Sequence, residues 1–274
     1  MSSSHRRVLP GFGLTLGFTT LVLTFLLLVP LTAVVLRTST LGWPKFVAAV
    51  WTERAQAAYL LTVGASLAAS LIDTVLGLLL AWVLVRYEFP GKRVFDSLID
   101  LPFALPTAVA GLVYSTLYVE SGWFGQFLVP LGIQGSYSRL GIVLVLSFIG
   151  LPFVVRTVQP VLESLDADVE EAAESLGATR LQTFARVLIP ALLPALLTGF
   201  ALTFARSLGE YGSVVFVSGN MPFKTEIAPV LIVSRLEEFA YAEATAISLV
   251  LLTGSFAMLA VINGLERRSR RHEA

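Results

Sequence analysis

Four ionisable residues stand within long apolar stretches of this sequence: Asp73, Arg156, Arg206 and Glu210. A charge in such surroundings is costly, so each of these residues is a candidate functional residue by default. The two arginines have the chemistry to lower the barrier for a passing anion. Because a strong cationic site would trap an anion instead of releasing it, we expect any such arginine to be partly compensated by a carboxylate.

Internal salt bridges are the alternative role for these residues, and the sequence leaves that alternative open. Arg206 and Glu210 are four residues apart, so on a helix they share a face and can neutralise each other. Asp73 and Arg156 could pair in the same way between two helices. Asp100, at the border of an apolar stretch, is a weaker candidate.

Two prolines interrupt the apolar stretch "LPFALPTAVAG" at residues 101–111. Pro102 and Pro106 each disfavour helical geometry at the residue before them, so a helix here should be bent or broken. Non-helical backbone at membrane depth is tolerated only where protein or a water-filled cavity covers it, and broken helices often border transport paths. A simple packing kink is the alternative.

The stretch "GEYGSVVFVSGN" at residues 209–220 is rich in glycine and hydroxyl groups. Tyr211 and Ser213 follow Glu210, and side-chain hydroxyls can donate hydrogen bonds to the oxygens of an oxyanion. We expect this stretch to leave an apolar span at the outer face, as a gate or a docking surface. The same residues are also common in ordinary loops.

One charged, amphipathic stretch, "DADVEEAAESLGATRLQTFARVLIP", lies at residues 166–190. Its first part places a narrow face of small and apolar residues at helical spacing, Val169, Ala172, Ala173 and Leu176. Gly177 stands where a left-handed helix cap is wanted. Thr179 and Gln182 have the spacing of a capping box for a second helix, which continues through Pro190 into an apolar span.

The small-residue face of this stretch suits insertion into a groove of a partner protein. Helices that lie on a membrane surface usually carry basic residues on the polar face and large apolar residues on the other, whereas this one is acidic and has Ala172 and Ala173. A purely structural hairpin is the alternative to partner docking.

The elements that must position these residues are membrane-spanning helices. The chain has 274 residues, of which 55% are hydrophobic and only 14% charged, against roughly 25% charged in a soluble domain. We predict an all-α membrane protein with six transmembrane helices, since a span needs about 20 apolar residues. The predicted spans are residues 8–36, 55–85, 101–119, 140–162, 187–205 and 244–265.

Lysine and arginine residues are unequally distributed over the two ends of these spans, and they are enriched on the cytoplasmic side. One side has Arg6, Arg7, Arg86, Lys92, Arg93, Arg180, Arg186, Arg267, Arg268, Arg270 and Arg271. The other has Arg37, Lys45, Arg54, Arg139, Lys224 and Arg235. Both termini and the acidic stretch are therefore predicted to be cytoplasmic. The net charge of zero argues against a nucleic-acid partner, and lipid is the expected surrounding.

Fixed spacing within the acidic stretch resembles a known family. Glu171, Ala172 and Ala173, then Gly177 after three residues, and a segment ending in Pro190 after nine more resemble the E-A-A-x3-G loop of ABC-importer permeases. With residues 100–112, 150–166, 188–220 and 224–237, the chain looks like the T-type permease subunit of bacterial sulfate/thiosulfate importers.

This resemblance implies a fold, partners and a location. The fold is the type I importer permease fold, with a cytoplasmic coupling helix between spans four and five, in the bacterial inner membrane. The partners are a similar W-type permease, two copies of a cytoplasmic ATPase and a periplasmic sulfate- or thiosulfate-binding protein. The five residues that carry the loop pattern are implied to contact the ATPase.

The sequence contains no G-x4-G-K-(S/T) phosphate loop, so ATP chemistry is expected on the partner ATPase, with no cofactor in this chain. We therefore expect no enzyme activity here. The expected division is residues 1–54 (cytoplasmic tip, first helix and outer loop), 55–265 (permease domain, with the coupling segment at about 163–190) and 266–274 (basic tail).

Three other functions remain open at this point. The nearest is a molybdate or tungstate permease of the same fold, since those anions are also tetrahedral dianions. A secondary transporter driven by an ion gradient through intramembrane carboxylates is less expected, because it has no need of the loop. The third is a membrane scaffold without transport activity.

Overall fold

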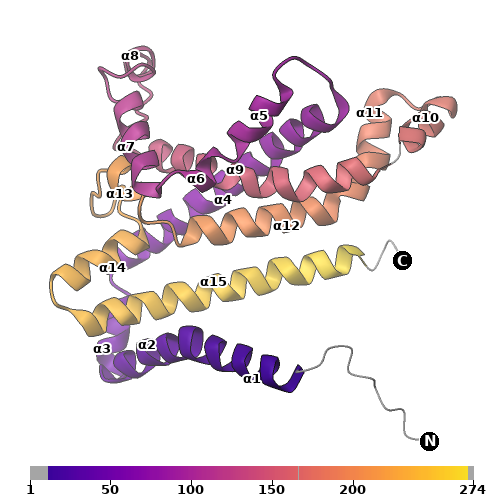
Figure 1. The fold of residues 1–274 in the computed structure, drawn as a ribbon. Helices are drawn as coiled ribbons and strands as arrows, with labels where there is room; N and C mark the ends of the chain where they lie inside the picture. Colours follow the sequence, from indigo (N-terminus) through magenta and orange to yellow (C-terminus); the bar gives the residue numbers. More distant parts are fainter. Residues whose placement is uncertain (1–11, 166, 271–274) are drawn as a thin grey trace, which may run out of the picture.

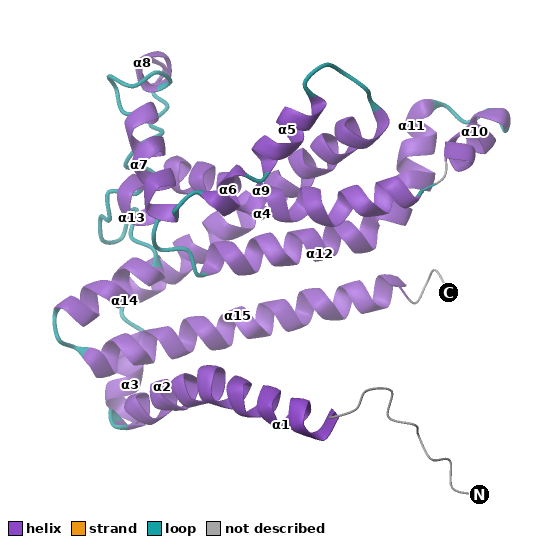
Figure 2. Cartoon of the chain, viewed as in Figure 1, coloured by secondary structure: helices purple, strands orange, loops and turns teal. Residues whose placement is uncertain are grey.

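The computed structural model describes residues 12–165 and 167–270, and these residues are almost entirely helical, with no strand among them (Figure 2). The all-α prediction is confirmed for this part of the chain. Residues 1–11, which include the predicted tip and the start of the first span, lie outside the described residues, as do Asp166 and residues 271–274 of the predicted tail.

The helices follow one another through short connections. In chain order they are α1 (Phe12–Leu23), a π-helical turn (Thr24–Leu28), α2 (Val29–Ser39), α3 (Gly42–Val50), α4 (Glu53–Arg86), α5 (Lys92–Ile99), α6 (Leu101–Ala104), α7 (Thr107–Tyr118), α8 (Gly125–Leu128), a 3-10 turn (Val129–Leu131), α9 (Arg139–Ser164), α10 (Ala167–Ser175), α11 (Arg180–Thr183), a second π-helical turn (Phe184–Leu188), α12 (Ile189–Leu208), α13 (Val214–Val217), α14 (Ala228–Glu237) and α15 (Tyr241–Arg270).

Five helical runs among the described residues are long and apolar enough to cross a membrane. They are Phe12–Ser39, Glu53–Arg86, Arg139–Ser164, Arg180–Leu208 and Tyr241–Ile262. They correspond to the first, second, fourth, fifth and sixth predicted spans.

The predicted third span is not one long helix, so the described residues contain five long spanning helices and not the six predicted. Its residues form α6 and the shorter apolar helix α7, separated at Leu105 and Pro106. Leu105 has extended geometry (φ −83°, ψ 133°), because the proline after it disfavours the helical region. The predicted interruption of this span is therefore confirmed.

Close packing of α4, α9 and α12 forms the centre of the molecule. Glycines allow the backbones to approach: a Cβ at Gly77 of α4 would collide with Val154 of α9, and a Cβ at Gly199 of α12 would lie 3.0 Å from the Cα of the same valine. Small residues are the usual means of helix association in membranes, where no hydrophobic force acts between helices.

The outer helices follow the two chain ends. Figure 1 shows α15 between α12 and the α1–α2 run, and α15 contacts both of them. The most apolar part of Phe12–Ser39 has no buried residue, so in the isolated chain its surface is free to face lipid. The start of α1 and the end of α15 lie at the same end of the molecule as α10 and α11 (Figure 1).

Both π-helical turns precede a proline. Pro30 and Pro190 stand at the start of the helices that follow the turns. Proline has no N–H, so the carbonyl four residues earlier loses its usual donor, and the wider π turn is a local adjustment to that loss. Pro190 thus marks the point at which the acidic stretch joins α12.

Candidate functional sites

The acidic stretch forms two short helices around a glycine turn, as its sequence predicts. Gly177 has a φ of +83°, and the amide of Ala178 donates to the carbonyl of Ala173 at 3.0 Å, which closes the end of α10. Thr179 and Gln182 form the complete capping box, with bonds of 2.8 and 3.3 Å. The two local predictions about this turn are confirmed.

The apolar residues of α10 are left uncovered by the rest of the chain. Val169, Ala172 and Leu176 are exposed, and 89% of Leu176 is accessible. Glu171 is exposed beside them, whereas Ala173 is half-buried. An uncovered helix face at the end of the molecule is the arrangement that docking into a partner's groove requires.

A second candidate site lies at the other end of α12, where Arg206, Glu210 and Ser213 come together. Arg206 Nη1 pairs with Glu210 Oε2 at 2.5 Å, so the predicted i, i+4 pair is confirmed. The other carboxylate oxygen of Glu210 accepts from the amide and the hydroxyl of Ser213, at 2.9 and 3.0 Å. Glu210 is buried, while 36% of the Arg206 side chain is accessible, so the cation faces outward from a fixed carboxylate.

The broken span packs directly against this turn. A Cβ at Gly111 of α7 would collide with the backbone of Ser213, and a Cβ at Gly212 would collide with the hydroxyl oxygen of Thr107. Tyr211 packs on the core cluster beside the turn. The two sequence stretches chosen for their prolines and hydroxyl groups are therefore neighbours, although about 100 residues separate them.

Arg156 forms an interhelical charge network with α5 and its C-terminal cap. Its guanidinium binds both carboxylate oxygens of Asp100, at 2.8 and 2.6 Å, and a carboxylate oxygen of Asp96 at 2.6 Å. It also binds the side chain of Gln159 at 2.7 Å. The expected compensation by a carboxylate is present here, as it is for Arg206.

The suggested pairing of Arg156 with Asp73 is wrong. Asp73 is completely buried on α4 and lies against Gly150 of α9, whereas Arg156 reaches outward to α5. Asp73 forms no ion pair among the described residues, and the hydroxyl of Ser147 on α9 is its polar neighbour. The sequence analysis missed Asp96, although Asp96 and Asp100 share the i, i+4 spacing of one face of a charged, amphipathic segment.

Arg86 is the other functional candidate that the sequence analysis missed, since it was used there only to predict orientation. Its Nη2 atom pairs with Glu170 of α10 at 2.8 Å. No spacing rule predicts this contact, because the two residues belong to helices far apart in the sequence.

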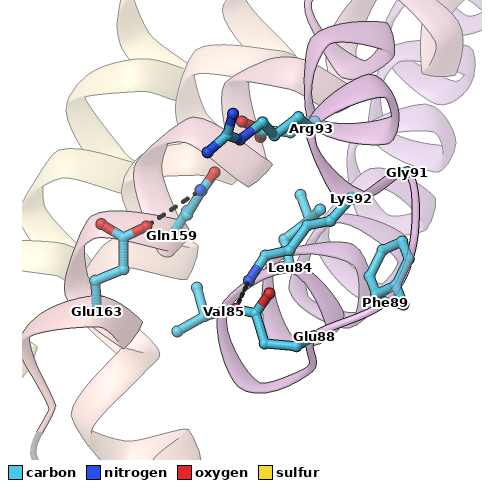
Figure 3. A pocket seen from close by; sticks show the side chains of 10 residues that line it. Leu84, Val85, Glu88, Phe89, Gly91, Lys92, Arg93, Gln159 and Glu163 are labelled. Carbon is cyan, nitrogen blue, oxygen red and sulfur yellow. Dashed lines mark hydrogen bonds and ion pairs between the residues drawn. The ribbon is translucent and has the colours of Figure 1, made fainter.

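A pocket of about 680 Å³ lies where the ends of α4 and α9 meet the start of α5. Figure 3 shows Lys92 and Glu88 on one side of the pocket, where they form an ion pair of 2.7 Å. On the other side, the amide of Gln159 donates a hydrogen bond of 3.2 Å to Glu163. The pocket is lined by both acidic and basic side chains, and Glu88, Lys92 and Glu163 bond to neighbouring side chains of the lining. The pocket therefore has no excess positive charge that would select an anion.

The described residues form an all-helical membrane protein with one broken span, and comparison with known proteins identifies its family. Residues 73–271 match the family described as "Binding-protein-dependent transport system inner membrane component". The chain belongs to this family. It is a multi-pass inner-membrane permease component of an ABC transporter and is not the ATPase of that system.

The particular relatives are sulfate permeases. The chain is 49% identical over 268 residues to the sulfate transport system permease protein CysT of Salmonella typhimurium, covering 98% of this chain and 97% of that protein. It is 48% identical to the protein of the same name from Escherichia coli (97% and 96% covered) and 50% identical to that of Synechocystis (93% and 89% covered).

Solved structures of ABC transporters share the fold. A chain of a bacterial alginate ABC transporter, in complex with a periplasmic protein bound to alginate pentasaccharide, has a TM-score of 0.76 at 19% identity, covering 93% of each chain. A chain of the MetNI methionine ABC transporter has a TM-score of 0.54 at 18% identity, covering 81% of this chain and 99% of that one. These likenesses show the ABC importer permease fold.

Proposed function

We propose that this chain is the permease subunit of an ATP-driven importer that moves sulfate and thiosulfate into the cytoplasm. The observation that carries the proposal is the 49% identity to a sulfate transport system permease over 98% of the chain. Identity at this level extends over the central helices, the broken span and the coupling segment, so the parts that would shape a path are included.

The segment from about residue 163 to 190 is proposed as the coupling element that binds a cytoplasmic ATPase. Its support is the exposed face of α10, with Leu176 uncovered, next to the loop residues Glu171, Ala172 and Ala173. Gly177 sets the turn between the helices, and Pro190 begins α12, so a push on α10 is passed into a spanning helix.

The translocation path is proposed to run beside the broken span, along Pro102, Pro106 and the turn of Glu210, Tyr211 and Ser213. Arg206 would attract a dianion, and the carboxylate of Glu210 would keep that attraction weak enough for release. Arg156 would border the same path, with its charge outweighed by Asp96 and Asp100. The Ser213 hydroxyl is held by Glu210, so its role is to orient that carboxylate.

Six crossings are proposed, with α5, α6 and α7 together making the third. This arrangement puts both termini and the coupling segment in the cytoplasm, in line with the distribution of Lys and Arg. The proposed division of the chain is residues 1–54 for the cytoplasmic tip, first helix and outer loop, 55–265 for the type I permease domain, and 266–274 for the basic tail.

A complete transporter would contain this chain, a similar W-type permease, two copies of the ATPase and a periplasmic binding protein. ATP and magnesium would bind to the ATPase only. Closure of the ATPase pair would draw the two coupling segments together and turn the path from the cytoplasm to the outside, where the binding protein delivers the anion.

Co-purification and complementation test this proposal together. The tagged chain should bring down an ATPase and a second permease from its host, and should restore growth on sulfate to a strain that lacks its own T-type permease. Growth restored on molybdate-limited medium only, or a chain purified alone, would contradict the sulfate permease assignment.

A further inference from the structure

The last turn of α4 contacts both ends of the coupling segment. At one end, Arg86 Nη2 pairs with Glu170 of α10 at 2.8 Å and donates to the carbonyl of Leu165 at 3.2 Å. At the other end, the Trp82 ring meets the Phe184 ring edge to face, with centroids 5.5 Å apart. Trp82 and Arg86 are four residues apart and therefore share one face of α4.

The Arg86–Glu170 pair lies where three helix ends meet. Arg86 is in the last turn of α4 and Glu170 in the first turn of α10, so each charge is also favoured by the dipole of its own helix. Leu165 is the C-cap of α9, and Arg86 supplies a donor for its carbonyl. With only 21% and 27% of the two side chains accessible, the pair is better shielded from water than a surface ion pair.

The aromatic contact completes the same connection. Phe184 stands in the π-helical turn that joins the coupling segment to α12, and Trp82 belongs to the cluster that packs α4 on α9 and α12. The guanidinium of Arg86 lies 5.9 Å from the centre of the Trp82 ring, within the range of a cation–π interaction. Two residues of α4 thus contact both ends of the segment: Arg86 contacts Leu165 and α10, and Trp82 contacts Phe184 after α11.

We infer that Arg86, supported by Trp82, is a positioning residue that transmits movement of the coupling segment to α4. This inference rests on the proposed coupling role of α10. The Arg86–Glu170 pair is a direct side-chain link between α10 and a spanning helix, in addition to the chain connections on either side of α10. With it, a displacement of α10 acts directly on α4, the helix that packs against both α9 and α12.

Arg86 acts here through Glu170 and not on the anion. Its loss should therefore reduce the amount of sulfate carried per ATP hydrolysed, rather than the affinity for sulfate. Because the pair works as one unit, Arg86→Gln and Glu170→Gln should have effects that do not multiply when they are combined.

The test uses the complete transporter in proteoliposomes, with sulfate uptake and ATP hydrolysis measured together. We expect Arg86→Gln to lower the ratio of sulfate to ATP at least fivefold, Glu170→Gln to do the same, and the double variant to be no worse. Arg86→Lys should recover part of the ratio, because it keeps the charge. Glu88→Gln removes an exposed ion pair with Lys92 just beyond the end of α4, outside the coupling segment, so it is the matched control and should leave the ratio unchanged.

The outcomes separate this inference from the proposed function. An unchanged ratio in Arg86→Gln and Glu170→Gln, or two losses that multiply, would overturn the positioning role while the wild-type complex still couples ATP to sulfate. A wild-type complex that does not couple them would overturn the proposed function itself. Should Arg86→Gln fail to assemble, Glu170→Gln decides the question, because it removes the same ion pair from the coupling helix.

Discussion

At the scale of single residues, the charges of this permease are arranged as compensated pairs. Arg206 is held by Glu210, and Arg156 by Asp96 and Asp100, each with at least one bond of 2.6 Å or less. Arg206 with Glu210 is neutral as a pair, and Arg156 with Asp96 and Asp100 has a net charge of −1, so neither arginine is free to bind a dianion tightly. The arrangement agrees with the general requirement that a transported ion must be released as well as attracted.

Arg156 can be tested by removing its charge. Arg156→Met leaves Asp96 and Asp100 facing each other without a cation, which should lower the free energy of unfolding by about 1–3 kcal/mol. We expect a value near the lower end of this range, because all three side chains are partly exposed to solvent. Thermal unfolding of the purified transporter measures this. Adding Asp96→Asn and Asp100→Asn should recover part of the loss, and a wild-type melting temperature for Arg156→Met would refute a stabilising role.

Gly177 provides the second test at this scale. Its φ of +83° is accessible to asparagine but costs other residues about 1–2 kcal/mol, most for a β-branched side chain. Gly177→Val should leave membrane insertion intact but weaken ATPase binding or uncouple hydrolysis from uptake. Gly177→Asn is the control and should behave almost normally, since no atom crowds this position. Normal coupled uptake by Gly177→Val would count against the turn.

At the scale of elements, the broken span is the feature that brings the candidate path together. The extended geometry at Leu105 redirects α7 so that Gly111 meets the backbone of Ser213, and Thr107 meets Gly212. Thr107 and Gly111 are four residues apart on α7, so both contacts come from one face of this helix, and the break sets the direction in which that face points. The interruption therefore orients the helix that packs on the turn of Glu210 and Ser213.

Straightening the break should impair transport. Pro106→Ala allows Leu105 to become helical, so a continuous helix competes with the observed break. We expect uptake to be about tenfold slower, which corresponds to a transport barrier higher by about 1.4 kcal/mol. Pro130→Ala is the matched control, because Pro130 is exposed and lies at the start of the 3-10 turn Val129–Leu131, away from the proposed path, where proline and alanine are both accepted. Equal uptake rates for the two variants would show that the break at Pro106 is dispensable.

The contact between α7 and the turn can be tested without altering a proline. Gly111→Ala introduces a Cβ that collides with the Ser213 backbone, so α7 must shift, at a cost of about 1–3 kcal/mol. We expect less assembled transporter and faster proteolysis of the turn. Gly209→Ala is the control and should behave like wild type, because Gly209 begins the same turn but has open space where the Cβ would lie. Resistance to proteolysis equal to wild type in Gly111→Ala would contradict the close approach.

Local patterns explain which of these elements could be predicted. The capping box of Thr179 and Gln182, the cap at Gly177 and the break before Pro106 each depend on neighbours in the sequence, and each is found as predicted. The partners of Arg156 and Arg86 depend on how helices are placed in space, and sequence spacing does not determine them. The predicted pairing of Asp73 with Arg156 is wrong for this reason, because the two residues lie within spans but on helix faces that point in different directions.

At the scale of the whole molecule, the chain separates its tasks along its length. The uncovered α10 lies at one end and the turn at Glu210 at the other, connected by α12 and by the tight contact of α4 with α9 (Figure 1). Glycine-mediated packing of α4, α9 and α12 makes one closely packed group between the two ends. The outermost run, Phe12–Ser39, stays largely exposed and is free to face lipid or a second permease.

The most direct test of the account is ATP-dependent accumulation of radiolabelled sulfate in proteoliposomes that contain this chain with its ATPase, second permease and binding protein. The account predicts uptake that requires ATP and is reduced by excess thiosulfate, and that is lost when the coupling segment carries Gly177→Val. Uptake that persists after ATP is removed, or that is blocked by molybdate but not by thiosulfate, would contradict it.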